Sequence, residues 1–192
     1  MIDYQYIQAL SQMAGSLLLN SPEQALIDHI NQSHSLTLSL EESQKAFNDT
    51  MVFAHSGLFI PPFEHVCNQV SNLEGNFSFP MAKFDGGDKL NEIYQQFHFN
   101  PANLSVTGTD LRKHLPLDHF GYILLFISHT FNAANLDSNS ASYPLLISFL
   151  EHRLAGLAFY QGLLATSQQP YICFVSELLA DTLSQLELLI KP

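Results

Sequence analysis

The feature that most restricts the fold of this chain is a helical segment that is apolar on nearly all of its sides. Apolar residues recur at positions 117, 120, 124, 127 and 131, the three-and-four spacing of one helix face. Tyr122, Ile123, Leu125 and Phe126 fill much of the opposite face. A helix that is apolar all round is buried among other elements. The sequence therefore predicts a helix over 117–133 at the centre of a helical bundle.

Other segments with helical periodicity surround this one. Ser39 can cap a helix reaching about Ala54, in which Glu42 completes a capping box. Pro170 begins the last helix, which carries one continuous apolar stripe. The remaining predicted helices cover 3–19, a segment opened by Ser21-Pro22-Glu23, 63–71, a segment from a capping Asp88 to about Phe99, and 143–165 with Ser142 as its cap. No stretch alternates long enough to predict a sheet, so 72–87 and 100–116 are expected to be irregular.

These segments predict an all-α, single-domain bundle of about seven helices over residues 1–192. The polar break at 135–142 is a candidate hinge of the sort that permits helix exchange between protomers, so both a monomer and a dimer fit the pattern.

The charge of the chain restricts its partners. Eighteen acidic against seven basic residues give a net charge of −11. Such a field repels a phosphate backbone, so no nucleic acid is expected as a partner, whereas a basic peptide is attracted. The acidity also serves solubility alone in many proteins, and this second explanation stays open.

Several features predict a cytoplasmic protein. Cys67 and Cys173 form no Cys-x-x-Cys pair, which is typical of a reducing compartment. No Lys or Arg precedes Lys45, so the positive segment of a secretory signal is missing. The most apolar run, 120–127, is far shorter than the roughly 20 residues that span a bilayer, so no stable membrane insertion is expected.

Two stretches about 50 residues apart suggest a binding groove. Residues 55–66 read HSGLFIPPFEHV, a loop that turns at Gly57, runs extended into two prolines and starts a short helix at Phe63. Residues 115–126 read LPLDHFGYILLF and place Asp118 and His119 at the start of the apolar helix.

Together the two stretches resemble the TorD/DmsD family of redox-enzyme maturation chaperones. The residues that match the family pattern are Gly57, Pro61, Pro62, Phe63, Glu64 and Val66, followed by Pro116, Asp118 and His119. The likeness covers roughly 40–190. Two departures are notable, because Ile123 and Leu125 occupy places where the family often has acids, and Cys67 replaces an aromatic residue. These departures bear on which protein such a chaperone would bind more than on the fold.

The resemblance implies a function. It implies a cytoplasmic chaperone, not an enzyme, that binds the twin-arginine signal peptide and the apo form of a molybdenum-cofactor oxidoreductase of the DMSO/TMAO reductase type. Export of this client would be delayed until its cofactor is inserted. No cofactor of the chaperone itself is expected. The candidate peptide-binding residues are Pro61, Pro62, Phe63, Glu64, Asp118, His119 and Tyr122.

The same residues have structural explanations. Taken alone, Asp118 is a carboxylate that satisfies free amides at the start of its own helix, and His119 is a half-buried side chain bonded to a backbone carbonyl. The resemblance adds that these positions lie in the region implicated in signal-peptide binding, where a carboxylate would pair with guanidinium groups. Pro61 to Glu64 can be a rigid loop with a helix start, a binding loop with Glu64 as a second anionic anchor, or both.

Two other functions remain as alternatives. His114, Asp118 and His119 could converge in a metal-dependent all-α enzyme, although no histidine pair has the spacing of a zinc site. A generic helical adaptor protein differs from the chaperone only in its client. No phosphate-binding or nucleophile motif occurs, so no nucleotide site is predicted.

Overall fold

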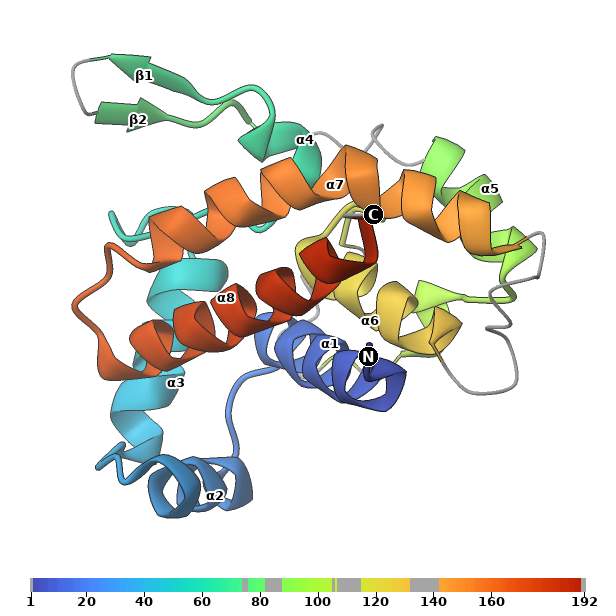
Figure 1. Cartoon of the computed structure of the whole chain (residues 1–192). Helices are drawn as coiled ribbons and strands as arrows, with labels where there is room; N and C mark the ends of the chain where they lie inside the picture. Colours follow the sequence, from blue (N-terminus) through green and yellow to red (C-terminus); the bar gives the residue numbers. More distant parts are fainter. Residues whose placement is uncertain are drawn as a thin grey trace.

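The computed structural model describes residues 2–73, 76–81, 88–104, 106, 115–131 and 142–190, and it is helical, as predicted. Within these residues there are eight α-helices, one 3₁₀ helix and one hairpin (Figure 1). The helices are α1 (Tyr4–Leu19), α2 (Gln24–His34), α3 (Leu40–Met51), α4 (Glu64–Cys67), α5 (Asp88–Gln96), α6 (Phe120–Thr130), α7 (Ser142–Leu164) and α8 (Pro170–Ile190), with η1 (Pro101–Asn103) after α5. The all-α bundle predicted from the sequence is confirmed.

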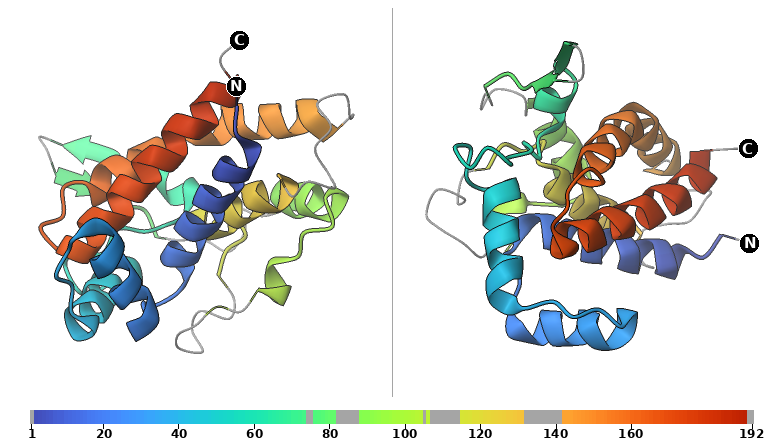
Figure 2. Two further views of the ribbon diagram at one scale, coloured as in Figure 1. Left: turned by 60° about the horizontal axis from the view of Figure 1, so that its bottom comes forward. Right: turned by 90° about the vertical axis from the view of Figure 1, so that its left-hand side faces the viewer.

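The apolar segment does form the central helix. Helix α6 is buried over nearly its whole length, with α1 packed along it and α7 and α8 beside them (Figures 1 and 2). Helices α1 and α6 approach closely where Gly15 faces Gly121, because neither glycine has a side chain to separate the backbones. Phe126 links α6 to the neighbouring helices, since its ring packs at a tilt against those of Tyr94 and Phe149, each at a centroid distance of 4.9 Å. The predicted position of this helix is correct.

The ends of the helices are set by local contacts that periodicity does not reveal. Helix α3 ends at Met51 rather than near Ala54, since the amides of Val52 and Phe53 both donate to the carbonyl of Asn48. Helix α6 begins at Phe120 rather than at 117, because His119 has an extended backbone with a ψ of 126°. The free amide of Phe120 donates instead to the carbonyl of Pro62 at 2.9 Å. Ser39 caps α3 as predicted, since the Glu42 amide donates to Ser39 Oγ at 3.2 Å. The Glu42 carboxylate accepts the Ser39 hydroxyl at 2.9 Å, whereas a capping box would have it accept the Ser39 backbone amide.

Helix α5 ends earlier than predicted for a geometric reason. The amide of Phe99 donates to the carbonyl of Tyr94 and the amide of His98 to that of Gln95, while His98 has a φ of 55°. This left-handed termination brings the Phe99 ring within 5.0 Å of the Tyr94 ring, the apolar contact that usually accompanies it. A histidine therefore occupies the position that most often holds glycine.

A short hairpin was not predicted. Strands β1 (Ser71–Leu73) and β2 (Asn76–Ser78) pair antiparallel, with Ser71 opposite Ser78, and the hairpin extends from the bundle beyond α4 (Figure 1). Phe77 reaches back to the Phe159 ring of α7 at 5.9 Å. The candidate hinge at 135–142 lies outside the described residues, except that Ser142 begins α7. No helix within the described ranges has both the length and the apolar character that crossing a bilayer requires.

Candidate functional site

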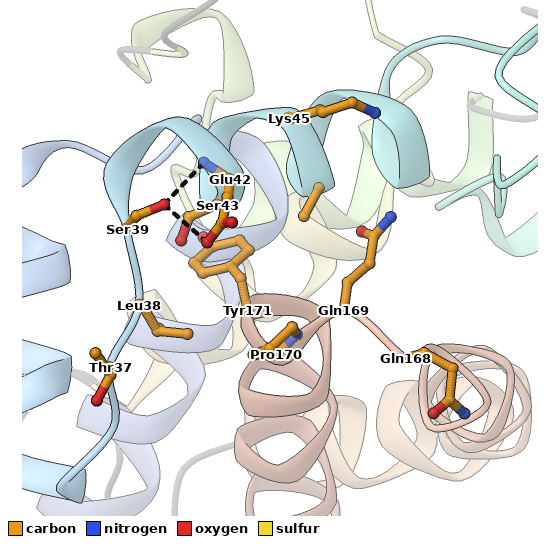
Figure 3. Close-up of a pocket in the computed structure, with 11 residues that line it drawn as sticks. Thr37, Leu38, Ser39, Glu42, Ser43, Lys45, Gln168, Gln169, Pro170 and Tyr171 are labelled. Carbon is orange, nitrogen blue, oxygen red and sulfur yellow. Dashed lines mark hydrogen bonds between the residues drawn. The ribbon is translucent and has the colours of Figure 1, made fainter.

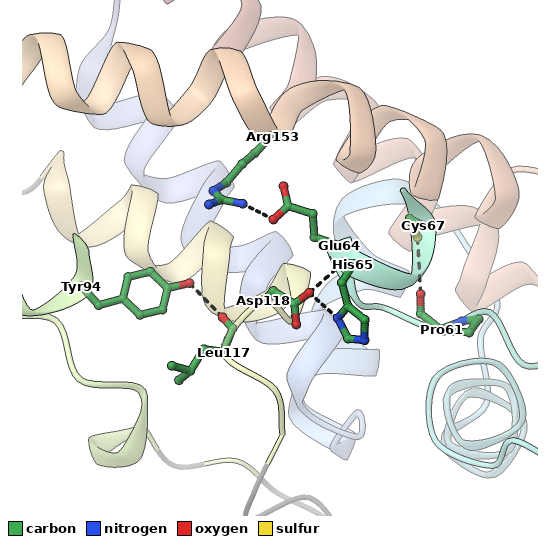
Figure 4. Close-up of polar contacts among 8 residues, drawn as sticks. All are labelled: Pro61, Glu64, His65, Cys67, Tyr94, Leu117, Asp118 and Arg153. Carbon is green, nitrogen blue, oxygen red and sulfur yellow. Dashed lines mark hydrogen bonds and ion pairs between the residues drawn. The ribbon is translucent and has the colours of Figure 1, made fainter. Parts of the chain in front are cut away.

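The two motif stretches meet in space and bond to each other through their backbones. Phe63 and His119 form an isolated antiparallel β-bridge. The amide of Glu64 donates to the carbonyl of Asp118 at 3.1 Å, and the amide of Phe120 donates to that of Pro62 at 2.9 Å. We call residues 61–67 and 116–122 together the junction (Figure 4). It ties the start of α4 to the start of α6.

The structure brings the predicted peptide-binding residues together but buries them. These are Pro61, Pro62, Phe63, Glu64, Asp118, His119 and Tyr122, and all seven are in the buried class. Their side chains contact other parts of this chain in the present conformation. Direct contact of these residues with a peptide therefore stays a prediction.

Asp118 has a different role from the helix cap that the sequence predicts. Its Oδ2 atom accepts the His65 amide at 2.8 Å and lies 2.5 Å from His65 Nδ1. The carboxylate thus satisfies an amide in the first turn of α4, not of α6. His119 is the cap of α6, where its Nδ1 accepts the Gly121 amide at 3.0 Å. With 2% of its surface exposed, Asp118 does not lie at the mouth of a groove.

Glu64 already pairs with a cation of this chain. Its Oε2 atom forms an ion pair with Nη1 of Arg153 in α7 (Figure 4). The Arg153 guanidinium also lies 4.6 Å above the Phe149 ring. Burial raises the pKa of the Glu64 carboxyl, and Arg153 opposes this shift. Both carboxylates that were predicted to anchor a peptide are therefore engaged within the chain.

Sequence reasoning missed the two partners of these carboxylates. Arg153 could have been singled out, because it is the only Lys or Arg in the 23 residues of α7. His65 directly follows Glu64 and gave no comparable signal. Two further bonds hold the edges of the junction, since Tyr94 Oη donates to the carbonyl of Leu117 at 3.1 Å and Cys67 Sγ lies 3.6 Å from the carbonyl oxygen of Pro61.

Cys67 should report whether the junction is closed. Burial raises the pKa of its thiol to about 12, from an ordinary 9.0, so the reactive thiolate is about a thousandfold rarer near pH 8. In a Cys173→Ser protein we expect iodoacetamide to label Cys67 at least a hundredfold more slowly than in urea, as followed by intact mass. Equal rates in the two conditions would mean that the junction is open.

An apolar groove adjoins the junction on the surface. It has a volume of about 520 Å³ and is lined by the loop at 57–60, by Phe77 and Phe79, by Leu163 of α7 and by the α7–α8 connection. Gly57 has a φ of +77°, so the predicted turn at this glycine is confirmed. The side chains of Leu58 and Phe77 are exposed at 53% and 42%. We call this the loop groove.

A second groove lies between the starts of α3 and α8. It has a volume of about 350 Å³, and Figure 3 shows Glu42 of α3 and Tyr171 of α8 on its two walls. Hydroxyl groups of Thr37, Ser39 and Ser43, the Lys45 side chain, and the amides of Gln168 and Gln169 complete most of its polar lining. We call this the α3 groove.

The metal alternative gains no support within the described residues. His114 lies outside the described residues. Asp118 bonds to His65, and His119 caps α6. In the part of the chain that the structure describes, no group of three or more His, Cys, Asp or Glu side chains could hold a metal ion.

Comparison with family models, with curated proteins and with solved structures finds no match to this chain. Functional conclusions therefore depend on its residues and their geometry.

Proposed function

We propose that this protein is a cytoplasmic, non-catalytic chaperone that binds the twin-arginine signal peptide and the apo form of a molybdenum-cofactor oxidoreductase. It delays export of the client until the cofactor is inserted. The observation that carries the proposal is the junction. The two stretches that resemble the TorD/DmsD family are separated by about 50 residues, yet Phe63 and His119 pair backbone to backbone.

The surface beside the junction supports this proposal. A twin-arginine leader is a basic pair followed by an apolar segment. The loop groove offers exposed Leu58 and Phe77, and the chain has a net charge of −11. Apolar burial would hold the leader, while the charge hastens the encounter and favours basic partners. In this proposal the buried residues of the junction hold the adjacent loop at 57–60 in position.

Affinity capture tests the proposed function. The purified full chain is used as bait in lysate of anaerobically grown host cells, and retained proteins are identified by mass spectrometry. We expect a molybdoenzyme precursor that still carries its twin-arginine leader. If such precursors are present in the input and none is retained, the proposed function is wrong.

Two matched variants make the capture specific. Leu58 in the loop groove and Leu145 on α7 are both 53% exposed, so Leu58→Ser and Leu145→Ser remove the same exposed side chain at different places. Neither change should affect folding, because surface substitutions away from buried features cost little. Leu58→Ser should lose most of the precursor and Leu145→Ser should retain it. Equal retention by both variants would exclude the loop groove as the docking surface.

A further inference from the structure

The loop groove and the α3 groove are two ends of one surface. Gln168 and Gln169 of the α7–α8 connection line both of them. Thr50 of α3 lies at this boundary and donates through its hydroxyl to Gln169 Oε1 at 3.4 Å. An extended ligand that occupies one groove can therefore pass over the connection into the other.

The two ends differ in chemistry. The loop groove is dominated by the apolar side chains of the 57–60 loop and by Phe77 and Phe79. The α3 groove contains an exposed carboxylate, that of Glu42, which the Ser39 hydroxyl holds at 2.9 Å. Helix α3 carries three carboxylates and one ammonium, and this ammonium, on Lys45, pairs with Asp49. Glu42 thus remains available to a cation from outside.

A buried hydroxyl also points to a ligand at this end. Tyr171 lines the α3 groove with 1% of its surface exposed, and its Oη atom has no hydrogen-bond partner among the described residues. Burial raises the pKa of Tyr171, so the hydroxyl stays neutral and can donate or accept. Buried polar groups normally have partners, so an unpartnered one beside a groove is unusual.

We infer that a peptide with a basic residue ahead of an apolar segment lies across the α7–α8 connection, with its cation at Glu42 and its apolar segment in the loop groove. The inference rests on the proposed function and assigns the cation to a residue different from the buried Glu64 and Asp118. A guanidinium matches a carboxylate by two parallel hydrogen bonds, whereas the described residues that line the loop groove include no charged side chain.

A pair of synthetic peptides tests this assignment. One probe carries two consecutive arginines followed by an alternating Leu-Ala segment, and the other has glutamines in place of the arginines. Fluorescence anisotropy gives Kd for both with wild type, Glu42→Gln and Leu58→Ser. The residue 42 amide can still donate to Ser39 Oγ and the glutamine oxygen can still accept the Ser39 hydroxyl, so Glu42→Gln should leave α3 intact. The control Glu151→Gln removes an equal charge from the exposed face of α7.

The expected pattern is specific to the assignment. Glu42→Gln should weaken binding of the arginine peptide about fivefold, the upper end of what an exposed ion pair contributes, and leave binding of the glutamine peptide unchanged. Leu58→Ser should weaken both peptides, and Glu151→Gln neither. If Glu42→Gln affects both peptides equally or neither, the assignment is wrong while the chaperone proposal stands. If wild type binds neither peptide, both are overturned.

Discussion

Replacing Arg153 with methionine is expected to lower the free energy of unfolding by about 3 kcal/mol, the cost of leaving one charge of a buried ion pair without its partner. Glu64 is nearly enclosed, with a side chain only 10% exposed, and Arg153 is its cation. Methionine keeps most of the apolar volume of the arginine stem, although it loses the guanidinium that lies over the Phe149 ring. Urea denaturation at neutral pH measures the loss.

Two companion variants decide whether charge is the cause. Adding Glu64→Leu to Arg153→Met should recover most of the loss, since an apolar pair can replace a buried ion pair at little cost. Lys45→Met breaks the Lys45–Asp49 pair, in which the lysine side chain is 74% exposed, and should cost under about 0.5 kcal/mol. A double variant as unstable as Arg153→Met alone would show that packing, not the unpaired carboxylate, is responsible.

The loss should also depend on pH with a defined sign. Burial already raises the pKa of Glu64 above its ordinary 4.5, and Arg153 is the main group that opposes the shift. In Arg153→Met the pKa rises further, so the native state holds this proton more tightly than the unfolded chain does. The stability contributed by the proton is complete below about pH 4.5 and lost as the pH rises through the native pKa. The deficit relative to wild type should therefore shrink on acidification.

The sequence predicted the parts of this fold that depend on long periodic patterns. Helix α8 begins at Pro170 as expected, and the all-round apolar character of 120–127 indicated a central helix. The hairpin was not predicted because its strands have three residues each, too few for an alternating pattern to be recognised. The end of α5 was predicted too late because His98 adopts the left-handed conformation that glycine usually adopts at a helix end.

The structure brings the candidate site residues together, but the sequence did not predict their partners or their burial. The sequence suggested that the two stretches form one groove, and the structure adds that Phe63 and His119 pair backbone to backbone. The charged partners are distant in sequence, because His65 is 53 residues from Asp118 and Arg153 is 89 residues from Glu64. A carboxylate at a helix start looks the same in the sequence whether it faces solvent or a buried cation. The burial of Glu64 and Asp118 therefore could not be predicted without the tertiary structure.

The close approach of α1 and α6 predicts that Gly121→Ala lowers the free energy of unfolding. In Gly121→Ala the added Cβ would lie 2.5 Å from Leu19 Cγ, 3.0 Å from the Gly15 carbonyl oxygen and 3.0 Å from His119 Nδ1. The leucine can turn away, but the backbone oxygen can move only with its helix. Overpacking of this kind costs about 1–3 kcal/mol, and we expect about 2 kcal/mol after the gain in helix propensity from alanine.

Gly162 provides the matched control for this substitution. It lies in α7, and a Cβ built there meets no heavy atom within 4 Å, so Gly162→Ala should raise the free energy of unfolding by about 1 kcal/mol through propensity alone. The two changes are chemically identical and opposite in expected sign. Equal effects would mean that α1 and α6 are not in close contact.

The same pair of variants tests whether the junction depends on the packing of α1 against α6. Gly121 follows His119 by two residues, and the His119 ring caps α6 through the Gly121 amide at 3.0 Å. An outward shift of α6 would therefore pull the 116–122 segment away from 61–67, where Cys67 is held against Pro61. In a Cys173→Ser background, Gly121→Ala should accelerate iodoacetamide labelling of Cys67, and Gly162→Ala should not. Loss of stability without faster labelling at Cys67 would show that the junction does not depend on the α1–α6 contact.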